Sequence, residues 1–431
     1  MWEPQYETMP RSELKKLQLE RLKHQLRHAY HKVPLYRTRF QEAGITPDDI
    51  TALEDIARLP FTYKEDFRDN YPYGLMAVPL SQVIRVHASS GTTGKPIIVP
   101  YTARDIDTWA NLIARNLTSA GVQQGDVIQN AYGYGLFTGG LGYHYGSEKI
   151  GATVIPSSVG NTKRQLMLIQ DLGTTTLACT PSYALILAET AQELGVDLTA
   201  TELRVAVCGA EPWTDEMRAE IEAKLGITAI DNYGLTELVG PGVSCECRYK
   251  NGMHIWEDHF LAELVDPPSG EPLPYGEQGE LVLTTLTKEA LPVIRFRTHD
   301  LVTMTSEECA CGRTFIRMSK ILGRTDDMLI IRGVNVFPTQ IESALLSIDG
   351  VAPHYQIIID RDHHLDEIEI WVEVREAISS DELRTMKEME EKVRGEMNSV
   401  LGISTRIKLV EPRTITRTEG KTKRVIDRRE L

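Results

Sequence analysis

Between residues 103 and 225 the sequence alternates helical spacings of apolar residues with short runs rich in β-branched residues. This alternation is typical of parallel strands joined by helical crossovers, and it restricts the fold class more than any other feature of the chain. We therefore expect a largely parallel sheet covered by helices. Helices are predicted at 103–121, 162–171, 183–194 and 214–225, and strands at 126–131, 152–156, 175–180 and 204–208.

Other parts of the chain have different patterns. Runs at 260–265, 279–284 and 292–297 alternate apolar and polar residues, which predicts antiparallel strands. Near the C-terminus, helices are predicted at 340–348 and from about 380 to 401, and strands at 354–360, 367–374 and 406–410. The predicted fold class is α/β: a large N-terminal domain (1–325) of helix-covered mixed sheets with a small antiparallel β part, and a smaller α+β C-terminal domain (326–431).

The composition restricts the class of partner. The 431 residues include 47 Lys and Arg against 61 Asp and Glu, a formal net charge of −14, which disfavours non-specific binding to nucleic acid. No apolar run approaches the length of a transmembrane helix. The first residues have neither the basic nor the apolar segment of a signal peptide. We expect a cytoplasmic protein that binds neither nucleic acid nor membranes.

A loop of small and hydroxyl residues, Ala88-Ser-Ser-Gly-Thr-Thr-Gly-Lys95, lies between two predicted strands at 83–87 and 96–100. Glycines let backbone amides approach an anion, hydroxyls donate to it, and the lysine adds positive charge. A Walker A loop has four residues between its glycines and is followed by a helix, whereas two residues separate Gly91 from Gly94 and a strand follows. From the residues alone, a phosphate-binding loop and an ordinary Gly/Ser/Thr turn are both open.

This loop and four further motifs occur in the order found in the acyl-adenylate-forming enzymes, the superfamily of acyl-CoA synthetases, luciferases and peptide-synthetase adenylation domains. The further motifs are Asn232-Tyr-Gly-Leu-Thr-Glu237, Arg295-Phe-Arg-Thr-His-Asp300, Gly323-Arg-Thr-Asp-Asp327 and Glu419-Gly-Lys421. The resemblance covers nearly the whole chain, and five ordered motifs are far more specific than one. Within the superfamily, the short overall length and segments 132–140 and 327–338 resemble the phenylacetate–coenzyme A ligases.

The resemblance implies an ATP site. The phosphate loop would hold the β- and γ-phosphates, the ring of Tyr233 would stack on adenine, and Asp300 would accept hydrogen bonds from both ribose hydroxyls. The glycine usual before this aspartate is His299 here, which affects the expected backbone geometry. The implied nucleotide-binding set is Ser90, Gly91, Thr92, Thr93, Gly94, Lys95, Gly209, Ala210, Glu211, Pro212, Asp231, Asn232, Tyr233, Gly234, Thr236, Asp300 and Arg324.

Three residues are implied to act in catalysis. Lys421 would reach the substrate carboxylate and the α-phosphate, Thr236 would contact phosphate, and Glu237 would hold Mg²⁺. Mg²⁺ prefers one or two carboxylates together with phosphate oxygens and water, so the Glu237 assignment is chemically reasonable. A solvated surface glutamate is the alternative interpretation of Glu237. The cofactors that the resemblance implies are ATP, Mg²⁺ and coenzyme A.

The resemblance also places the acyl pocket at the Gly- and aromatic-rich segment 132–142, where the residues alone equally allow the first turn of a helix. The small domain would rotate about Asp326 after the first half-reaction, and a homodimer is expected because many relatives form dimers. The implied substrate-binding residues are Tyr132, Tyr134, Phe137 and Gly139, and the implied coenzyme A residues are Arg332, Gly333, Val334 and Asn335.

Cysteine spacing predicts a structural zinc site that does not belong to the general superfamily pattern. Its five candidate ligands are Cys245, Cys247, His254, Cys309 and Cys311. Because zinc in structural sites has four tetrahedral ligands, one of the five would be left out, and the sequence does not decide which. Reduced surface thiols are the alternative. Disulfides are disfavoured in a cytoplasmic chain of this size.

Taken together, these features predict an ATP-dependent, AMP-forming acid–thiol ligase. A carboxylic acid, phenylacetate, would be activated as its acyl adenylate with release of pyrophosphate, and the acyl group would then pass to coenzyme A, giving phenylacetyl-CoA and AMP. One alternative keeps the adenylation but uses another aromatic or short-chain acid. The other is a zinc-stapled nucleotide-binding protein without ligase activity.

Overall fold

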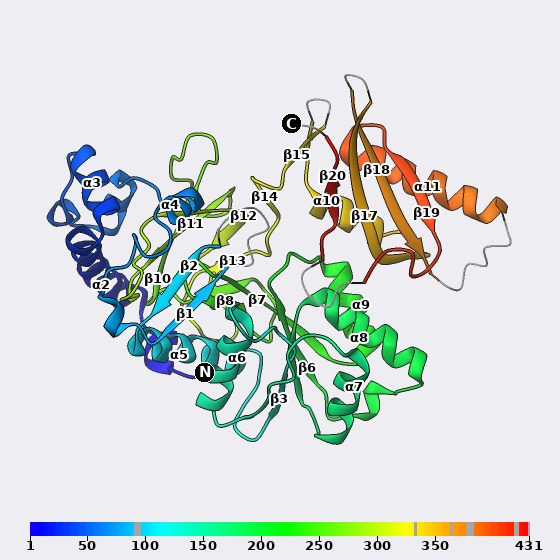
Figure 1. Ribbon diagram of the computed structural model, residues 1–431, viewed down its shortest axis with the longest axis horizontal. Helices are drawn as coiled ribbons and strands as arrows, with labels where there is room; N and C mark the ends of the chain where they lie inside the picture. Colours follow the sequence, from blue (N-terminus) through cyan, green and yellow to red (C-terminus); the bar gives the residue numbers. More distant parts are fainter. Residues whose placement is uncertain (90–95, 332–333, 363–364, 376–382, 418–421, 430–431) are drawn as a thin grey trace.

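The computed structural model describes residues 1–89, 96–331, 334–362, 365–375, 383–417 and 422–429. Within that part, a mixed sheet of twelve strands forms the body of the molecule, and a separate four-stranded sheet lies toward the C-terminus (Figure 1). The predicted α/β fold class is therefore confirmed.

One half of the large sheet is parallel, as predicted. Its strands, in spatial order, are β4 (Thr153–Ile155), β3 (Val127–Asn130), β5 (Thr176–Cys179), β6 (Val205–Gly209) and β7 (Thr228–Leu235). All adjacent pairs in this half are parallel. The central strands β5 and β6 are buried along their whole length, which explains why they read as continuous apolar runs.

Helices follow these strands and cover the sheet (Figure 1). They are α5 (Ala103–Ser119), α6 (Thr138–Lys149), α7 (Thr162–Asp171), α8 (Pro181–Leu194) and α9 (Asp215–Leu225). The hydroxyls of Thr102, Thr180 and Thr214 accept the first free amides of α5, α8 and α9. Gly195 and Gly226, with φ of 67° and 68°, end α8 and α9. These local signals explain why the helix limits could be predicted closely.

The other half of the large sheet is antiparallel. From its edge inward it contains β10 (Phe260–Val265), β11 (Gln278–Thr285), β12 (Phe296–Thr305), β13 (Arg317–Met318), β9 (Met253–Ile255) and β8 (Gly240–Glu246), which joins β7; β14 (Gly323–Arg324) pairs with β12. The strand predicted at 292–297 was placed too early, because β12 begins at Phe296. Arg295 has a φ of 48°, which interrupts the extended backbone. Its guanidinium donates to Glu263 and to the backbone carbonyls of Ala57 and Leu59.

The hydroxyl-rich loop joins two antiparallel strands, β1 (Arg85–Ala88) and β2 (Ile98–Tyr101), as the sequence predicts. The ring of His87 in β1 lies edge-on to the stacked rings of Tyr101 in β2 and Trp109. Trp109 belongs to α5, so the hairpin is fixed to the helical layer of the body. This anchoring holds both ends of the loop in place.

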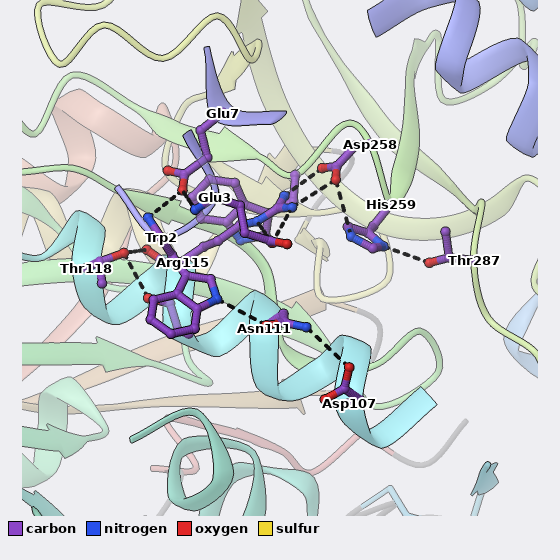
Figure 2. Close-up of polar contacts among 12 residues, drawn as sticks. Trp2, Glu3, Glu7, Asp107, Asn111, Arg115, Thr118, Asp258, His259 and Thr287 are labelled. Atoms are coloured by element: carbon purple, nitrogen blue, oxygen red, sulfur yellow. Dashed lines mark hydrogen bonds and ion pairs between the residues drawn. The ribbon is translucent and has the colours of Figure 1, made fainter. Parts of the chain in front are cut away.

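The N-terminal segment is fastened to the body by a buried polar network (Figure 2). Arg115 of α5 is 0 % exposed and donates to both carboxylate oxygens of Asp258, at 2.6 and 2.9 Å, and to Glu3 at 2.8 Å. The indole of Trp2 donates to Asn111 at 3.0 Å. The segment then continues into helices α1 (Pro4–Glu7), α2 (Arg11–Lys32), α3 (Pro34–Glu42) and α4 (Lys64–Asp69).

The C-terminal domain has its own sheet and core. It contains β15 (Leu329–Ile331), β16 (Val334–Val336), α10 (Pro338–Leu346), β17 (Val351–Asp362), β18 (Leu365–Val374), α11 (Leu383–Leu401), β19 (Arg406–Val410) and β20 (Val425–Asp427). The sheet order is β19-β18-β17-β20, and Figure 1 shows this domain beside α8 and α9. None of the helices in the described part is both long and apolar enough to span a membrane.

Candidate functional site

A cavity of about 570 Å³ lies where the segment that follows β6 and the C-terminal part of β7 face α10 and β17. Ligands of open α/β sheets bind beyond the carboxyl ends of strands, and this cavity is in that position. The predicted site residues that line it are Ala210, Glu211, Pro212, Asp231, Asn232, Tyr233, Gly234, Asp300, Arg324 and Asp326. Gly209 ends β6 just behind them, where an added Cβ would lie 2.3 Å from the carbonyl oxygen of Asn232.

Sequence reasoning missed several other residues of the cavity wall, among them Trp213, Glu342 and Tyr355. Trp213 directly follows the Gly-Ala-Glu-Pro stretch, so its position was a usable signal. Glu342 and Tyr355 come from α10 and β17 of the C-terminal domain. Their place in the wall depends on how that domain packs, and no local sequence pattern reports it.

Asp300 is the anionic centre of the cavity and is 2 % exposed. The Tyr233 hydroxyl donates to its Oδ2 at 2.6 Å, and Arg324 donates to its Oδ1 at 2.6 Å. Burial, and then the charge of Asp300, raise the pKa of Tyr233, so this hydroxyl stays a donor. Arg324 also holds both carboxylate oxygens of Asp326 at 2.9 Å. One guanidinium therefore joins the predicted ribose-binding aspartate to the predicted hinge.

A second carboxyl, Asp231, stands in the cavity wall next to a buried ion pair. Arg218 donates to both oxygens of Glu246 at 2.8 Å, and the Asp231 amide donates to the same Glu246 at 2.8 Å. Burial, and then the charge of Glu246, raise the pKa of Asp231 to about 7. Its surroundings therefore favour the protonated form more than water does.

His299, the residue that departs from the superfamily pattern, has a φ of 63°. That region favours glycine, because a Cβ there crowds the following carbonyl. The imidazole Nδ1 lies 2.9 Å from the hydroxyl of Thr325, and the His299 amide donates to Glu280 at 3.1 Å. These bonds hold the backbone in the conformation that glycine would adopt freely, and Asp300 keeps its place in the cavity.

The predicted catalytic residues Thr236 and Glu237 follow β7. The Thr236 hydroxyl lies 3.5 Å from that of Thr138, the first residue of α6. Glu237 is 6 % exposed, which excludes its interpretation as a solvated surface glutamate. Burial, then the charges of Asp105 and Glu237, raise the pKa of Tyr101 in β2, so Glu237 lies close to the hairpin that carries the predicted phosphate loop.

The predicted acyl segment leads into α6, which begins at Thr138, so a loop and a helical first turn are both present. Tyr132 stacks on Tyr143 at 5.3 Å. The Tyr134 hydroxyl accepts from Asn130 at 2.9 Å, and burial raises its pKa to about 12. Phe137 is 49 % exposed. The described residues that line the 570 Å³ cavity do not include this segment. Tyr132 nevertheless borders the cavity wall, because its hydroxyl interacts with the side chain of Asn232, which lines the cavity.

Several predicted residues fall in other parts of the chain. Gly139 lies close to Tyr132, since an added Cβ would come within 3.2 Å of the tyrosine Cβ. Val334 and Asn335 pair with β15 in a short hairpin. The predicted residues outside the described part are Ser90, Gly91, Thr92, Thr93, Gly94, Lys95, Arg332, Gly333 and Lys421.

Four of the five candidate zinc ligands gather in one place. The ligand atoms of Cys247, His254, Cys309 and Cys311 all lie within 4.8 Å of one another. The fifth, Cys245, points elsewhere: its thiol contacts the carbonyl of Asn116 at 3.8 Å.

The spacing within this cluster fits a tetrahedral metal ion. Zinc bonds of about 2.3 Å to sulfur and about 2.0 Å to nitrogen place sulfurs about 3.8 Å apart and sulfur about 3.5 Å from nitrogen. Cys247 and Cys309 have their sulfurs 3.7 Å apart, and the Cys311 sulfur lies 3.3 Å from Nε2 of His254. The contact with Cys247, and also that with His254, lower the pKa of Cys311, whereas the contact with Cys311 raises the pKa of Cys247. The thiolate, which is the form that binds metal, is therefore favoured at Cys311.

Comparison with known proteins gives concordant matches. The chain matches the family model described as AMP-binding enzyme over residues 15–286, and that described as AMP-binding enzyme C-terminal domain over 333–429. It is 51% identical to the phenylacetate-coenzyme A ligase of Thermus thermophilus, covering 100% of both chains.

Solved structures of another ligase share the fold. Crystal structures of 2-hydroxyisobutyryl-CoA ligase match with a TM-score of 0.93 in the postadenylation state with R3-HIB-AMP (31% identity, 99% of this chain and 92% of that one). The same ligase with 2-HIB-AMP and CoA in the thioesterification state matches with a TM-score of 0.74 (32% identity, 98% and 91%).

Proposed function

The chain belongs to the AMP-binding enzyme family, and we propose that it is an AMP-forming ligase that joins phenylacetate to coenzyme A. Identity of 51% over the full length of the Thermus thermophilus ligase supports the substrate. In the first step the phenylacetate carboxylate attacks the α-phosphorus of ATP, giving phenylacetyl adenylate and pyrophosphate. In the second step the coenzyme A thiol attacks the acyl carbon and AMP leaves.

The observation that carries this proposal is the arrangement around Asp300. A buried carboxylate held by Tyr233 and Arg324 faces a cavity large enough for a nucleotide, and a carboxylate can accept both hydroxyls of a vicinal diol. The adjacent ring of Tyr233 offers a face to the adenine base. The segment that follows β6 would form the opposite edge of the base site.

The first step makes electrostatic demands on the protein. Phenylacetate is ionised at pH 7, so no general base is needed, but negative charge accumulates as carboxylate meets triphosphate. Lys421 would bridge the carboxylate and the α-phosphate, and the hairpin loop would hold the β- and γ-phosphates. Thr236 would donate to phosphate.

Glu237 fits a role as the magnesium ligand. No ion pair to this buried carboxylate is found among the described residues, and an isolated buried charge is costly. Mg²⁺ bound with ATP would supply the missing positive charge and neutralise phosphate oxygens. The carboxylate of Glu237 would fix the cation on the hairpin side of the site.

For the second step we propose that the chain divides into domains at 1–325 and 326–431 and pivots at Asp326. Rotation would withdraw Lys421 and bring Arg332, Gly333, Val334 and Asn335 to the coenzyme A arm. The bidentate contact between Arg324 and Asp326 supports this pivot, because it ties the hinge to the ribose-binding aspartate. A hinge only has to absorb a change in φ and ψ.

We further propose that Cys247, His254, Cys309 and Cys311 hold a structural zinc ion. The four-ligand set, its spacing and its burial support this assignment. The ion would tie Cys247, which follows β8, and His254 of β9 to the loop between β12 and β13, and none of its four ligands lines the cavity. Metal analysis of the purified protein should give one zinc per chain, and C309S should lose it; equal zinc in both proteins would refute the site.

We also propose a cytoplasmic homodimer, for which light scattering coupled to size exclusion is the test of the dimer. The ligase proposal itself is tested by ATP–pyrophosphate exchange with a panel of acids. Exchange driven by phenylacetate, followed by thioester and AMP when coenzyme A is added, is the expected result. Exchange with a different acid would replace the substrate and keep the mechanism. ATP binding without any exchange would leave a nucleotide-binding protein without ligase activity.

A further inference from the structure

The C-terminal domain rests on α8 and α9 through ion pairs of uniform polarity: the helices supply the acids and the domain supplies the bases. Glu189 and Glu193 lie one turn apart on α8, and Glu220 lies on α9. Their partners are His354 and Arg417 for Glu189, Arg413 for Glu193, and Arg375 for Glu220. A surface of one sign facing a surface of the other is a docking arrangement.

Glu189 is the centre of these contacts. Its Oε1 lies 2.5 Å from Nε2 of His354, and its Oε2 lies 3.4 Å from Nε of Arg417. Arg417 is itself held by two bonds to the buried carboxylate of Glu373, at 2.8 and 2.9 Å, within the C-terminal domain. The Glu189 carboxylate therefore meets one imidazole and one arginine, and the arginine has a fixed position.

Glu211 makes a related contact beside the cavity. One carboxylate oxygen accepts the amide of Ser182 at 2.8 Å, and the other accepts the amide of Thr422 at 3.1 Å. Thr422 directly follows Lys421 in the sequence. The Glu211 carboxylate thus joins the first turn of α8 to the residue next to the proposed adenylation lysine.

These contacts belong to one arrangement of the two parts of the chain, the one whose fold matches the postadenylation structure with a TM-score of 0.93. We propose that Glu189, Glu193, Glu211 and Glu220 form an acidic docking face that holds the C-terminal domain in position for adenylation. Glu189 and Glu211 are its main positioning residues. This inference rests on the proposed function, because it assigns the contacts to one of the two half-reactions.

The strength of the contacts suits a reversible dock. Most of the charged groups are partly exposed, and exposed ion pairs are individually weak and screened by salt. Several weak pairs of one polarity favour the docked arrangement without locking it. The adenylation step should therefore be sensitive to ionic strength and to removal of these charges, whereas the thioester step should not.

The direct test compares the half-reactions in the variant E189Q/E193Q/E220Q and in E211Q. We expect each to lower kcat of ATP–pyrophosphate exchange about tenfold. For the triple variant the KM for ATP should not change, since Tyr233 and Asp300 are intact. In the triple variant, whose three residues lie outside the cavity wall, thioester formation from supplied phenylacetyl adenylate and coenzyme A should keep its wild-type rate. The matched control is D171N/E202Q, which removes exposed acids away from this face.

A charge swap separates loss of the contact from loss of folding, and a scattering measurement tests the docked arrangement without any substrate. The swap E189K/H354E should recover most of the exchange lost in E189K alone. Small-angle X-ray scattering should show a larger radius of gyration for the triple variant, and for the wild type at high salt, than for the wild type at low salt. Equal losses in both half-reactions, or no change in either, would overturn the docking face. A wild type inactive with every acid would overturn the ligase proposal, and scattering alone would then decide the docking face.

Discussion

Replacing Arg115 by methionine should destabilise the protein by about 3–5 kcal/mol, because it removes one partner of a buried ion pair and leaves the other uncompensated. Arg115 is 0 % exposed, and Asp258, which receives two of its hydrogen bonds, is also fully buried (Figure 2). Methionine fills much of the same volume, so the predicted loss arises from charge and not from a cavity.

Few neighbouring groups can compensate the charge of Asp258 once Arg115 is replaced. Arg21 lies 3.6 Å from the Asp258 carboxylate, too far for a direct hydrogen bond, and burial lowers the pKa of His259 to about 3, so this neighbour is neutral at pH 7. Loss of Arg115 also removes the partner of Glu3, one of the contacts that hold the N-terminal segment to the body. We therefore expect a value toward the upper end of the range.

The assay is chemical denaturation followed by tryptophan fluorescence, with R115M, D258N and the double variant R115M/D258L. The double variant should recover most of the loss, because replacing both charges by apolar groups removes the uncompensated one. If R115M is within about 1 kcal/mol of the wild type, or if the double variant is as unstable as the sum of the single changes, the reasoning about this pair is wrong.

Three further predictions follow from packing, acid sensitivity and the cavity. G146A should lower the free energy of unfolding by about 1–3 kcal/mol, because the added Cβ would lie 2.3 Å from Cγ2 of Ile113. G395A, on an open helical face, should leave stability unchanged or raise it, and thermal melts compare the two variants. The pKa of His259 is about 3 in the folded protein and about 6.5 in the unfolded chain, so between these pH values only the unfolded chain protonates this imidazole. The free energy of unfolding should therefore fall by up to about 1.4 kcal/mol for each pH unit below 6.5. Denaturation curves should show a smaller pH dependence for H259Q. D300N should raise the KM for ATP about 10- to 100-fold while D171N leaves it unchanged; equal KM values would remove Asp300 from the ribose site.

The sequence predicts best those elements whose signals are local. The limits of α7, which has an Asn161 N-cap, are matched residue for residue. Those of α8 and α9 are matched within two residues at each end, and threonine caps and terminal glycines mark those ends. The start of β12 was misplaced because the bend at Arg295 depends on Glu263, a distant partner. No periodicity reports a contact of that kind.

The same distinction holds for the site. Motif order identifies Tyr233, Asp300 and Arg324, and the structure brings all three to one cavity. Cys245 is excluded from the zinc cluster because its side chain points to another side of the sheet, toward Asn116. The spacing of cysteines in the sequence could not predict that direction. Tyr355 and Glu342 reach the cavity only through the packing of the C-terminal domain.

The most direct measurement of the central claim follows the carboxylate oxygens of phenylacetate labelled with ¹⁸O. Attack on the α-phosphorus joins one of these oxygens to the nucleotide, and thiolysis then leaves it on AMP. We predict one ¹⁸O atom in AMP and one in the thioester carbonyl after a single turnover with ATP and coenzyme A. Label in inorganic phosphate, with ADP as the product, would contradict adenylation and with it the role proposed for this site.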